Sequence, residues 1–162
     1  MAGLPGLRMS GMRRESFVRV KPEWVDHYGH MNLAYYLVAF DLATDAVWPA
    51  LNLGEGFRAR GLGTFAVESW QAYRREVLLD MPLAAESEVL AFDAKRLLVA
   101  HRLYHAEEGW LSAENEVLFL CVDLGTRRVA SWPADVLARF AAAKVERAPQ
   151  RLALKRGALN AP

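Results

Sequence analysis

The heptapeptide Asp26-His27-Tyr28-Gly29-His30-Met31-Asn32, followed by the segment Leu33–Trp48 (LAYYLVAFDLATDAVW), decides the fold. The segment contains no Gly or Pro and is apolar on nearly every side, which predicts a helix of about four turns that is buried all round. Asn32 is a suitable N-cap, and Pro49 disfavours a helical Trp48 and so predicts the other end. Such a helix needs a cover on all sides, and the sequence that follows supplies mainly strands.

The composition predicts one domain, because the chain has 162 residues and a mass of 18.2 kDa. The net charge of +1 gives no electrostatic reason to expect nucleic acid or an acidic membrane as a partner. Cys121 is the only cysteine, which excludes an intrachain disulfide and fits a reducing cytoplasm. We expect a flexible leader at 1–14 with no apolar run for a signal or a membrane span, a domain at 15–147, and a loosely attached tail at 148–162.

The rest of the chain predicts one short helix and several strands. Strands are expected at Glu15–Lys21, Thr64–Leu79, Glu86–Lys95, Arg96–Ala106 and Leu111–Asp123. A glycine-rich connection occupies residues 52–63, and Pro133 at the first helical position opens a helix that ends near Lys144. This order predicts an α+β fold, with a long central helix wrapped by a curved antiparallel sheet of five or six strands and a short C-terminal helix.

The loop and the helix share a pattern with a known family. The chain contains Asp26-x-x-Gly29-His30-x-Asn32-x-x-x-Tyr36-x-x-x-Phe40-Asp41-x-Ala43. This resembles the signature of the 4-hydroxybenzoyl-CoA thioesterase-like branch of the hotdog-fold superfamily, over Glu15 to about Asp123. Two positions depart from the signature: Leu33 replaces its second Asn, and Thr44 replaces its helix Arg. The resemblance implies an acyl-CoA thioesterase without a separate cofactor, since coenzyme A is part of the substrate. It also implies a homodimer or a dimer of dimers with the site between subunits.

A narrower resemblance is to the thioesterases associated with L-carnitine dehydrogenase, which act on betainyl-CoA. It rests on Tyr35-Tyr36, on Phe40-Asp41 through Thr44-Asp45, and on Phe92-Asp93-Ala94-Lys95-Arg96-Leu97 followed by His101 and His105. It implies a role in carnitine metabolism and an acyl group that carries a quaternary ammonium.

Asp26 is the candidate catalytic group. It precedes a helix N-terminus, where backbone N–H groups lack partners and the helix dipole is positive. A thioester carbonyl placed there would have its oxyanion stabilised, while Asp26 attacks the carbonyl or activates water. The alternative is an ordinary turn residue. Gly29, His30 and Asn32 match the signature, and we expect them to shape the loop and donate hydrogen bonds. Tyr36 matches the tyrosine of the signature and completes the candidate catalytic set.

Asp41 and Asp45 share one face of the helix, where like charges four residues apart are destabilising. One interpretation is a set of structural salt bridges to arginines such as Arg74, Arg75 or Arg96. The other is an acidic, aromatic acyl pocket that attracts a quaternary ammonium, although aromatic residues on a buried helix also suit a plain core. The candidate pocket residues are Tyr35, Phe40, Asp41, Asp45, Glu68 and Trp70.

The phosphates of coenzyme A call for basic contacts, for which Lys95 and Arg96 with Arg102, or Arg127-Arg128 in a turn, are candidates. No metal is expected, because the pairs His27-x-x-His30 and His101-x-x-x-His105 lack a Cys or Glu ligand at a convincing spacing. Two other functions remain open. One is a hotdog dehydratase or hydratase that uses a His and Asp pair, and the other is a non-catalytic acyl-CoA binding module.

Overall fold

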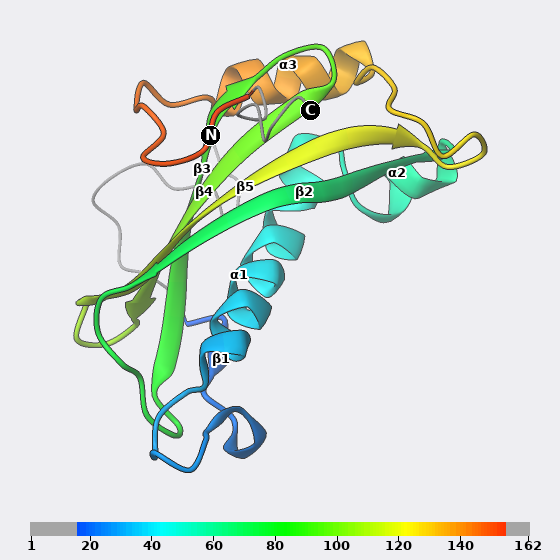
Figure 1. Cartoon of the computed structure of the whole chain (residues 1–162). Helices are drawn as coiled ribbons and strands as arrows, with labels where there is room; N and C mark the ends of the chain where they lie inside the picture. The colour runs from blue at the N-terminus through cyan, green and yellow to red at the C-terminus, as the bar shows by residue number, and fades with distance from the viewer. Residues whose placement is uncertain (1–15, 155–162) are drawn as a thin grey trace, which may run out of the picture. The chain divides into compact units, whose positions relative to one another are not determined.

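The computed structural model describes residues 16–154, so the expected leader at 1–14 lies outside the described residues. Five strands form one curled antiparallel sheet in the order β1-β3-β4-β5-β2 (Figure 1). Their bounds are β1 Val18–Arg19, β2 Leu62–Tyr73, β3 Pro82–Phe92, β4 Arg96–His105 and β5 Leu111–Asp123. The described chain forms two compact units, residues 16–47, 71–87 and 101–115 in the first and 48–70, 88–100 and 116–154 in the second.

The expected strands are present, but β1, β2 and β3 differ from their expected bounds by several residues. β1 is only two residues long. β2 ends at Tyr73 instead of Leu79, because the N–H groups of Arg74 and Arg75 both donate to the carbonyl of Ser112, at 2.8 and 3.1 Å. Two residues of one strand that bond to a single residue of its neighbour form a β-bulge, and a β-bulge interrupts the regular pairing of the two strands. β3 begins at Pro82 instead of Glu86, and a proline suits this position because the first residue of a strand tolerates a missing N–H.

The long helix α1 spans Leu33–Val47 and is followed by the 3-10 helix Trp48–Leu51. Pro49 accounts for this end, since it lacks the N–H that would continue the α-helical ladder. In the first unit α1 packs on the sheet, and one apolar cluster contains Tyr36, Ala39, Phe40, Leu83, Leu103 and Ala113. The sheet therefore covers one face of α1.

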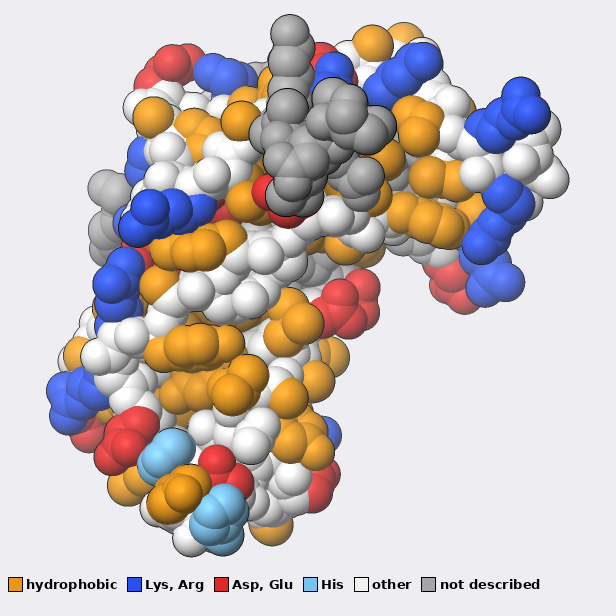
Figure 2. All heavy atoms as spheres, in the orientation of Figure 1, with side chains coloured by type: hydrophobic (Ala, Val, Ile, Leu, Met, Phe, Trp, Pro, Cys, Tyr) orange, Lys and Arg blue, Asp and Glu red, His pale blue; other side chains and the backbone are white. Residues whose placement is uncertain are grey.

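The prediction that α1 is buried on all sides is wrong. Leu37, Val38 and Leu42 are 39–48% exposed, and Asp41 and Asp45 are exposed beside them. Figure 2 shows hydrophobic and acidic side chains together over α1. A pattern that is apolar all round cannot tell which face meets the sheet and which face meets something else. An exposed apolar helix face of this kind is typical of an interaction surface.

The second unit holds two further helices. The helix α2, Glu55–Ala59, lies where only a glycine-rich connection was expected, and its Phe57 is buried with its ring 6.0 Å from that of Trp132. The C-terminal helix α3 spans Ala134–Ala143, so Pro133 is its N-cap and not its first residue. A separate apolar cluster in this unit is formed by Leu90, Leu98, Ala100 and Leu118.

Residues 148–154 are fixed to the sheet, although a loosely attached tail was expected. Glu116 on β5 is 1% exposed, and its carboxylate accepts hydrogen bonds from the backbone N–H groups of Gln150, Arg151 and Leu152. Leu152 also packs against the apolar cluster of the second unit. A buried carboxylate requires such donors, and it holds the segment in return. Residues 155–162 lie outside the described chain.

Cys121 is buried within β5, and its Sγ donates to the carbonyl of Ser131 at 3.6 Å. Burial, together with the nearby charge of Asp123, raises the pKa of the thiol to about 11. The thiolate form is therefore scarce at neutral pH.

Candidate active site

The loop before α1 is a tight turn within the first unit. Val25 and Met31 form an antiparallel bridge, and inside it the Asp26 N–H donates to the His30 carbonyl at 3.1 Å. The Gly29 N–H donates back to the Asp26 carbonyl at 3.0 Å, and Gly29 has a φ of 87°. A glycine adopts this conformation without the steric cost that a side chain would bring. The turn thus explains why the pattern requires Gly29.

The Asp26 carboxylate is half-buried and oriented from two sides. Its Oδ1 accepts from the Tyr28 N–H at 2.9 Å, and its Oδ2 lies 3.5 Å from Nδ2 of Asn32. The Oδ1 of Asn32 accepts from the Ala34 N–H at 3.0 Å, which confirms Asn32 as the N-cap. One amide side chain therefore ties the candidate carboxylate to the first turn of α1.

Most backbone N–H groups at this helix start already have acceptors. The Met31 N–H donates to the Val77 carbonyl, and the Asn32 N–H donates to the Trp24 carbonyl. The Ala34 N–H donates to the Asn32 side chain, and the Tyr35 N–H donates to the Asn32 carbonyl. Within residues 16–154 the Leu33 N–H has no acceptor. The expected group of helix donors is thus reduced to one backbone N–H beside Asp26. A sequence pattern cannot reveal this, because it depends on which carbonyls fold back onto the loop.

The ring of His30 contacts the Met31 carbonyl, Glu76 and Tyr28. Its Nδ1 lies 3.4 Å from the Met31 carbonyl, and its Nε2 lies 3.8 Å from the Glu76 carboxylate. Its ring is also stacked with that of Tyr28, with centroids 6.3 Å apart. These contacts fit a residue that shapes the loop.

Two of the aromatic candidates belong to the core. Tyr36 is 4% exposed, meets Tyr73 edge to face at 5.0 Å, and has its pKa raised mainly by burial. Phe40 is 1% exposed and stacks on His101 at 6.1 Å. Tyr35 is only partly buried, and its ring stacks on Trp24 at 5.7 Å. Of these three, Tyr35 alone keeps part of its surface open.

Asp41 and Asp45 form no ion pair within residues 16–154. Partial desolvation, and then the charge of Asp45, raises the pKa of the Asp41 carboxyl. The three arginines expected to neutralise the pair have other partners: Arg74 binds Glu114, Arg75 lies over Trp110, and Arg96 binds Asp93. The salt-bridge interpretation is therefore wrong, since these arginines lie near other groups along their own strands and turns.

The four remaining candidates belong to the second unit. Glu68 and Trp70 lie on β2, and the Arg151 guanidinium is 5.9 Å from the Trp70 ring centroid. Lys95 lies in the turn before β4 and Arg96 is the first residue of that strand, and the backbone N–H groups of both donate to Asp93. Because the Arg96 guanidinium also binds Asp93 at 2.8 Å, its charge is already neutralised.

The buried His101, which the sequence placed in the narrower resemblance and in a histidine pair considered for metal binding, links α1 to the sheet. The Thr44 hydroxyl donates to the Phe40 carbonyl at 2.9 Å, so it accepts from Nε2 of His101, also at 2.9 Å. This leaves Nδ1 of His101 to accept from the Ser87 hydroxyl at 2.8 Å. His101 is 1% exposed, and burial lowers its pKa to about 4. The imidazole is therefore neutral at pH 7.

Within residues 16–154 no three His, Cys, Asp or Glu side chains are grouped closely enough to hold a metal ion. In the same part of the chain, no helix has the length and apolar character needed to cross a membrane.

Comparison with known proteins identifies the family. Residues 20–140 match the family model of the thioesterase-like superfamily, and the chain belongs to this superfamily. The sheet, the long helix and the short C-terminal helix are the hotdog fold expected from the sequence. A Staphylococcus aureus protein solved in complex with coenzyme A shares this fold, with a TM-score of 0.74 at 22% identity over 88% of this chain and 94% of that one.

Two curated relatives are more specific. The betainyl-CoA thioesterase of Pseudomonas aeruginosa is 37% identical over 124 residues, which cover 76% of this chain and 78% of the relative. The L-carnitine dehydrogenase/betainyl-CoA thioesterase of Agrobacterium fabrum is 34% identical over 114 residues, which cover 70% of this chain. The match spans 23% of that longer relative. These similarities confirm the expectation of a thioester hydrolase.

Proposed function

We propose that this protein hydrolyses betainyl-CoA to betaine and coenzyme A, with Asp26 as the catalytic carboxylate. The observation that carries the proposal is the joint position of Asp26 and the Leu33 N–H. The carboxylate accepts from the Tyr28 N–H and lies 3.5 Å from the side-chain amide of Asn32, and the next residue, Leu33, has a backbone N–H without an acceptor within residues 16–154. The similarity to betainyl-CoA thioesterases supports the choice of substrate.

In the proposed reaction the thioester carbonyl oxygen accepts a hydrogen bond from the Leu33 N–H. Asp26 Oδ2 then attacks the carbonyl carbon, or it takes a proton from a water molecule that attacks. The carbon–sulfur bond breaks and the sulfur leaves as the thiolate of coenzyme A. If Asp26 attacks, water hydrolyses the resulting anhydride and restores the carboxylate. Both routes develop negative charge on the carbonyl oxygen, where a preorganised donor and the helix dipole stabilise it.

Asp41 and Asp45 on α1 carry the charge that a cationic acyl group needs. They lie too far along the helix to contact an acyl group that is bound at the Asp26 loop of their own chain. Asp41 lies eight residues after Leu33, about 12 Å along the helix axis. In betainyl-CoA the ammonium nitrogen is two bonds from the reacting carbonyl carbon. The pair therefore does not reach an ammonium held at the same chain's Leu33. We assign Asp41 and Asp45 to the site of a second copy of the chain, where two carboxylates attract a quaternary ammonium.

The exposed face of α1 supports such a dimer. Leu37, Val38 and Leu42 present apolar surface next to the acidic pair. Covering this surface with the same face of a second copy gives a twofold interface, in which each chain contributes to both sites. A homodimer, or a dimer of dimers built from it, is the assembly that fits.

The test is the release of free thiol from a panel of thioesters that includes betainyl-CoA, short straight-chain acyl-CoA and aromatic acyl-CoA. We expect strong release from betainyl-CoA and a loss of at least about a hundredfold in Asp26→Asn. Glu23→Gln, which removes an exposed carboxylate outside the loop, is the matched control. Wild-type turnover by Asp26→Asn would contradict the role of Asp26. Hydration of an enoyl-CoA without thiol release would favour a hydratase, and tight binding without turnover would favour a binding module.

A further inference from the structure

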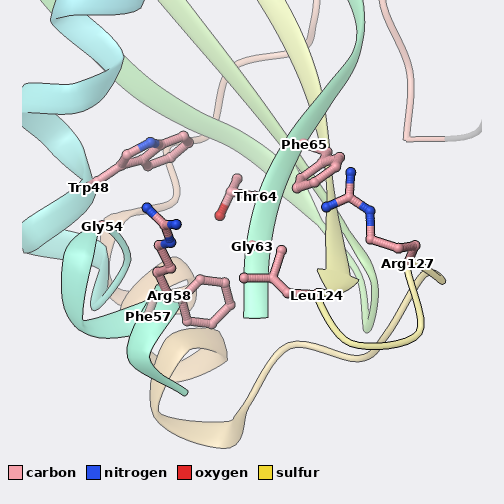
Figure 3. A pocket seen from close by; sticks show the side chains of 9 residues that line it. All are labelled: Trp48, Gly54, Phe57, Arg58, Gly63, Thr64, Phe65, Leu124 and Arg127. Atoms are coloured by element: carbon pink, nitrogen blue, oxygen red, sulfur yellow. The ribbon is translucent and has the colours of Figure 1, made fainter. Parts of the chain in front are cut away.

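A basic, aromatic groove lies in the second unit. It has a volume of about 500 Å³ and is lined by residues that include Trp48, Phe57, Arg58, Gly63, Phe65 and Arg127. Figure 3 shows that Arg58 comes from α2 and Arg127 from the turn after β5, with the start of β2 between them. Sequence reasoning missed Arg58 and named Arg127 only as one alternative.

The two guanidinium groups of this groove are not neutralised. Within residues 16–154 neither Arg58 nor Arg127 forms an ion pair, and no Asp or Glu lines the groove. The neighbouring Arg60, by contrast, binds Asp135 at 2.9 Å. Two unpaired cations that line one concave surface favour a ligand with several negative charges.

The groove also offers aromatic faces. The Arg127 guanidinium lies 5.3 Å from the centroid of Phe65, whose side chain is partly exposed. Trp48 is half-buried, with its edge against Phe119 at 4.9 Å. A side chain at Gly63 would come within 2.9 Å of both Leu124 and the Phe65 ring, so this glycine keeps the floor of the groove open. Flat aromatic surfaces beside guanidinium groups favour the stacking of a nucleobase.

We propose that this groove binds the phosphorylated adenosine end of coenzyme A. Arg58 and Arg127 contact the phosphates, and Trp48 or Phe65 stacks on the adenine. The proposal rests on an acyl-CoA substrate, and it replaces the expected phosphate contacts Lys95 and Arg96, since the charge of Arg96 is taken by Asp93.

The first experiment measures binding without catalysis. Isothermal titration with adenosine 3′,5′-bisphosphate should show saturable binding to the wild type, and Arg58→Gln and Arg127→Gln should each weaken it about tenfold. Arg139→Gln is the matched control, because Arg139 is exposed on α3 and does not line the groove. Equal binding by all four proteins would overturn the proposal. Displacement of the nucleotide by an equal concentration of inorganic phosphate would also overturn it, since the site would then recognise phosphate alone.

The second experiment compares an acyl-CoA with the same acyl group on pantetheine, which lacks the nucleotide. Arg58→Gln and Arg127→Gln should raise KM for the acyl-CoA about tenfold, with kcat unchanged and with pantetheine thioester hydrolysis unaffected. Equal losses on both substrates would place these arginines elsewhere in the mechanism and overturn the proposal. If the wild type hydrolyses neither thioester, the proposed function fails, and the titration still decides whether the groove binds the nucleotide.

Discussion

The Thr44 hydroxyl lies 2.9 Å from Nε2 of His101 and links the last turn of α1 to β4 inside the core. Because this hydroxyl donates to the Phe40 carbonyl, the histidine must carry its proton on Nε2. Ser87 supplies the proton that Nδ1 accepts. The neutral imidazole matches this link, because Nδ1 accepts from the Ser87 hydroxyl. A protonated ring would make the Ser87 oxygen the acceptor and would take away the acceptor that the hydroxyl hydrogen now has.

This link predicts a loss of stability in mild acid. The pKa of His101 is about 4 in the folded chain, below its ordinary value of 6.5. The stabilising effect is thus complete above pH 6.5 and is lost as the pH falls toward 4, because the unfolded chain takes up the proton first. The total is on the order of 3 kcal/mol. Urea unfolding of the wild type at several pH values should show a free energy of unfolding that falls as the pH is lowered from 6.5 toward 4. His101→Gln should lack this contribution, and an unchanged slope in the variant would contradict the assignment.

Leu33→Pro tests the oxyanion donor directly. Proline is favoured at the first residue of a helix, and it removes only the N–H that has no acceptor. We expect the fold to persist, as monitored by circular dichroism, and kcat to fall by about a hundredfold to a thousandfold. Leu33→Ala, which keeps the N–H, is the control and should retain kcat within about threefold. Comparable losses in both variants would indicate that the side chain matters and the N–H does not.

The acidic pair predicts a change in substrate preference. Asp41→Asn with Asp45→Asn should lower kcat/KM for betainyl-CoA about tenfold or more and leave that for butyryl-CoA, which is neutral and of similar length, nearly unchanged. The double variant should also be slightly more stable, by about 0.3 kcal/mol, because a like-charge pair is removed. Parallel losses on both substrates would return the pair to a structural role.

Subunit mixing tests whether that pair acts across a dimer. Asp26→Asn and the Asp41→Asn, Asp45→Asn double variant are each impaired on betainyl-CoA. After refolding together in equal amounts, about a quarter of the wild-type sites should be restored, because half the dimers are mixed and each mixed dimer has one intact site. If the residues act within one chain, mixing restores nothing. Sedimentation of Val38→Glu, which should shift the protein toward monomer, checks the interface independently.

The predictions from sequence held where the chemistry is local. Asp26, Gly29 and Asn32 lie within seven residues, so the turn, the cap and the helix start follow from their spacing. Long-range features could not be predicted. No pattern around Glu116 indicates that it meets residues 150–152, and none around Arg74 indicates that Glu114 would bind it. The exposed face of α1 escaped prediction for a different reason, because its apolar residues have the same character as those facing the sheet.

We expect the loss of the Glu116 charge to lower the stability of the fold by an unusually large amount for a single residue of a strand. Glu116→Gln places amide hydrogens against backbone N–H donors, so we expect the free energy of unfolding to fall by about 2–3 kcal/mol. Limited proteolysis should then cleave near residue 150 sooner than in the wild type. Glu146→Gln, at a side chain 94% exposed, should change neither readout. Unchanged proteolysis in Glu116→Gln would show that the apolar contacts of Leu152 suffice to hold the segment.

The burial of Cys121 decides how cleanly the reaction can be followed. Chromogenic disulfides detect released coenzyme A by reacting with any accessible thiolate, including those of the protein itself. The only thiol of this chain is enclosed in β5 with a pKa of about 11, so it reacts with such reagents only when the strand unfolds. The colour that develops over the folded protein therefore reports product, and a delayed rise in an enzyme-only blank reports denaturation.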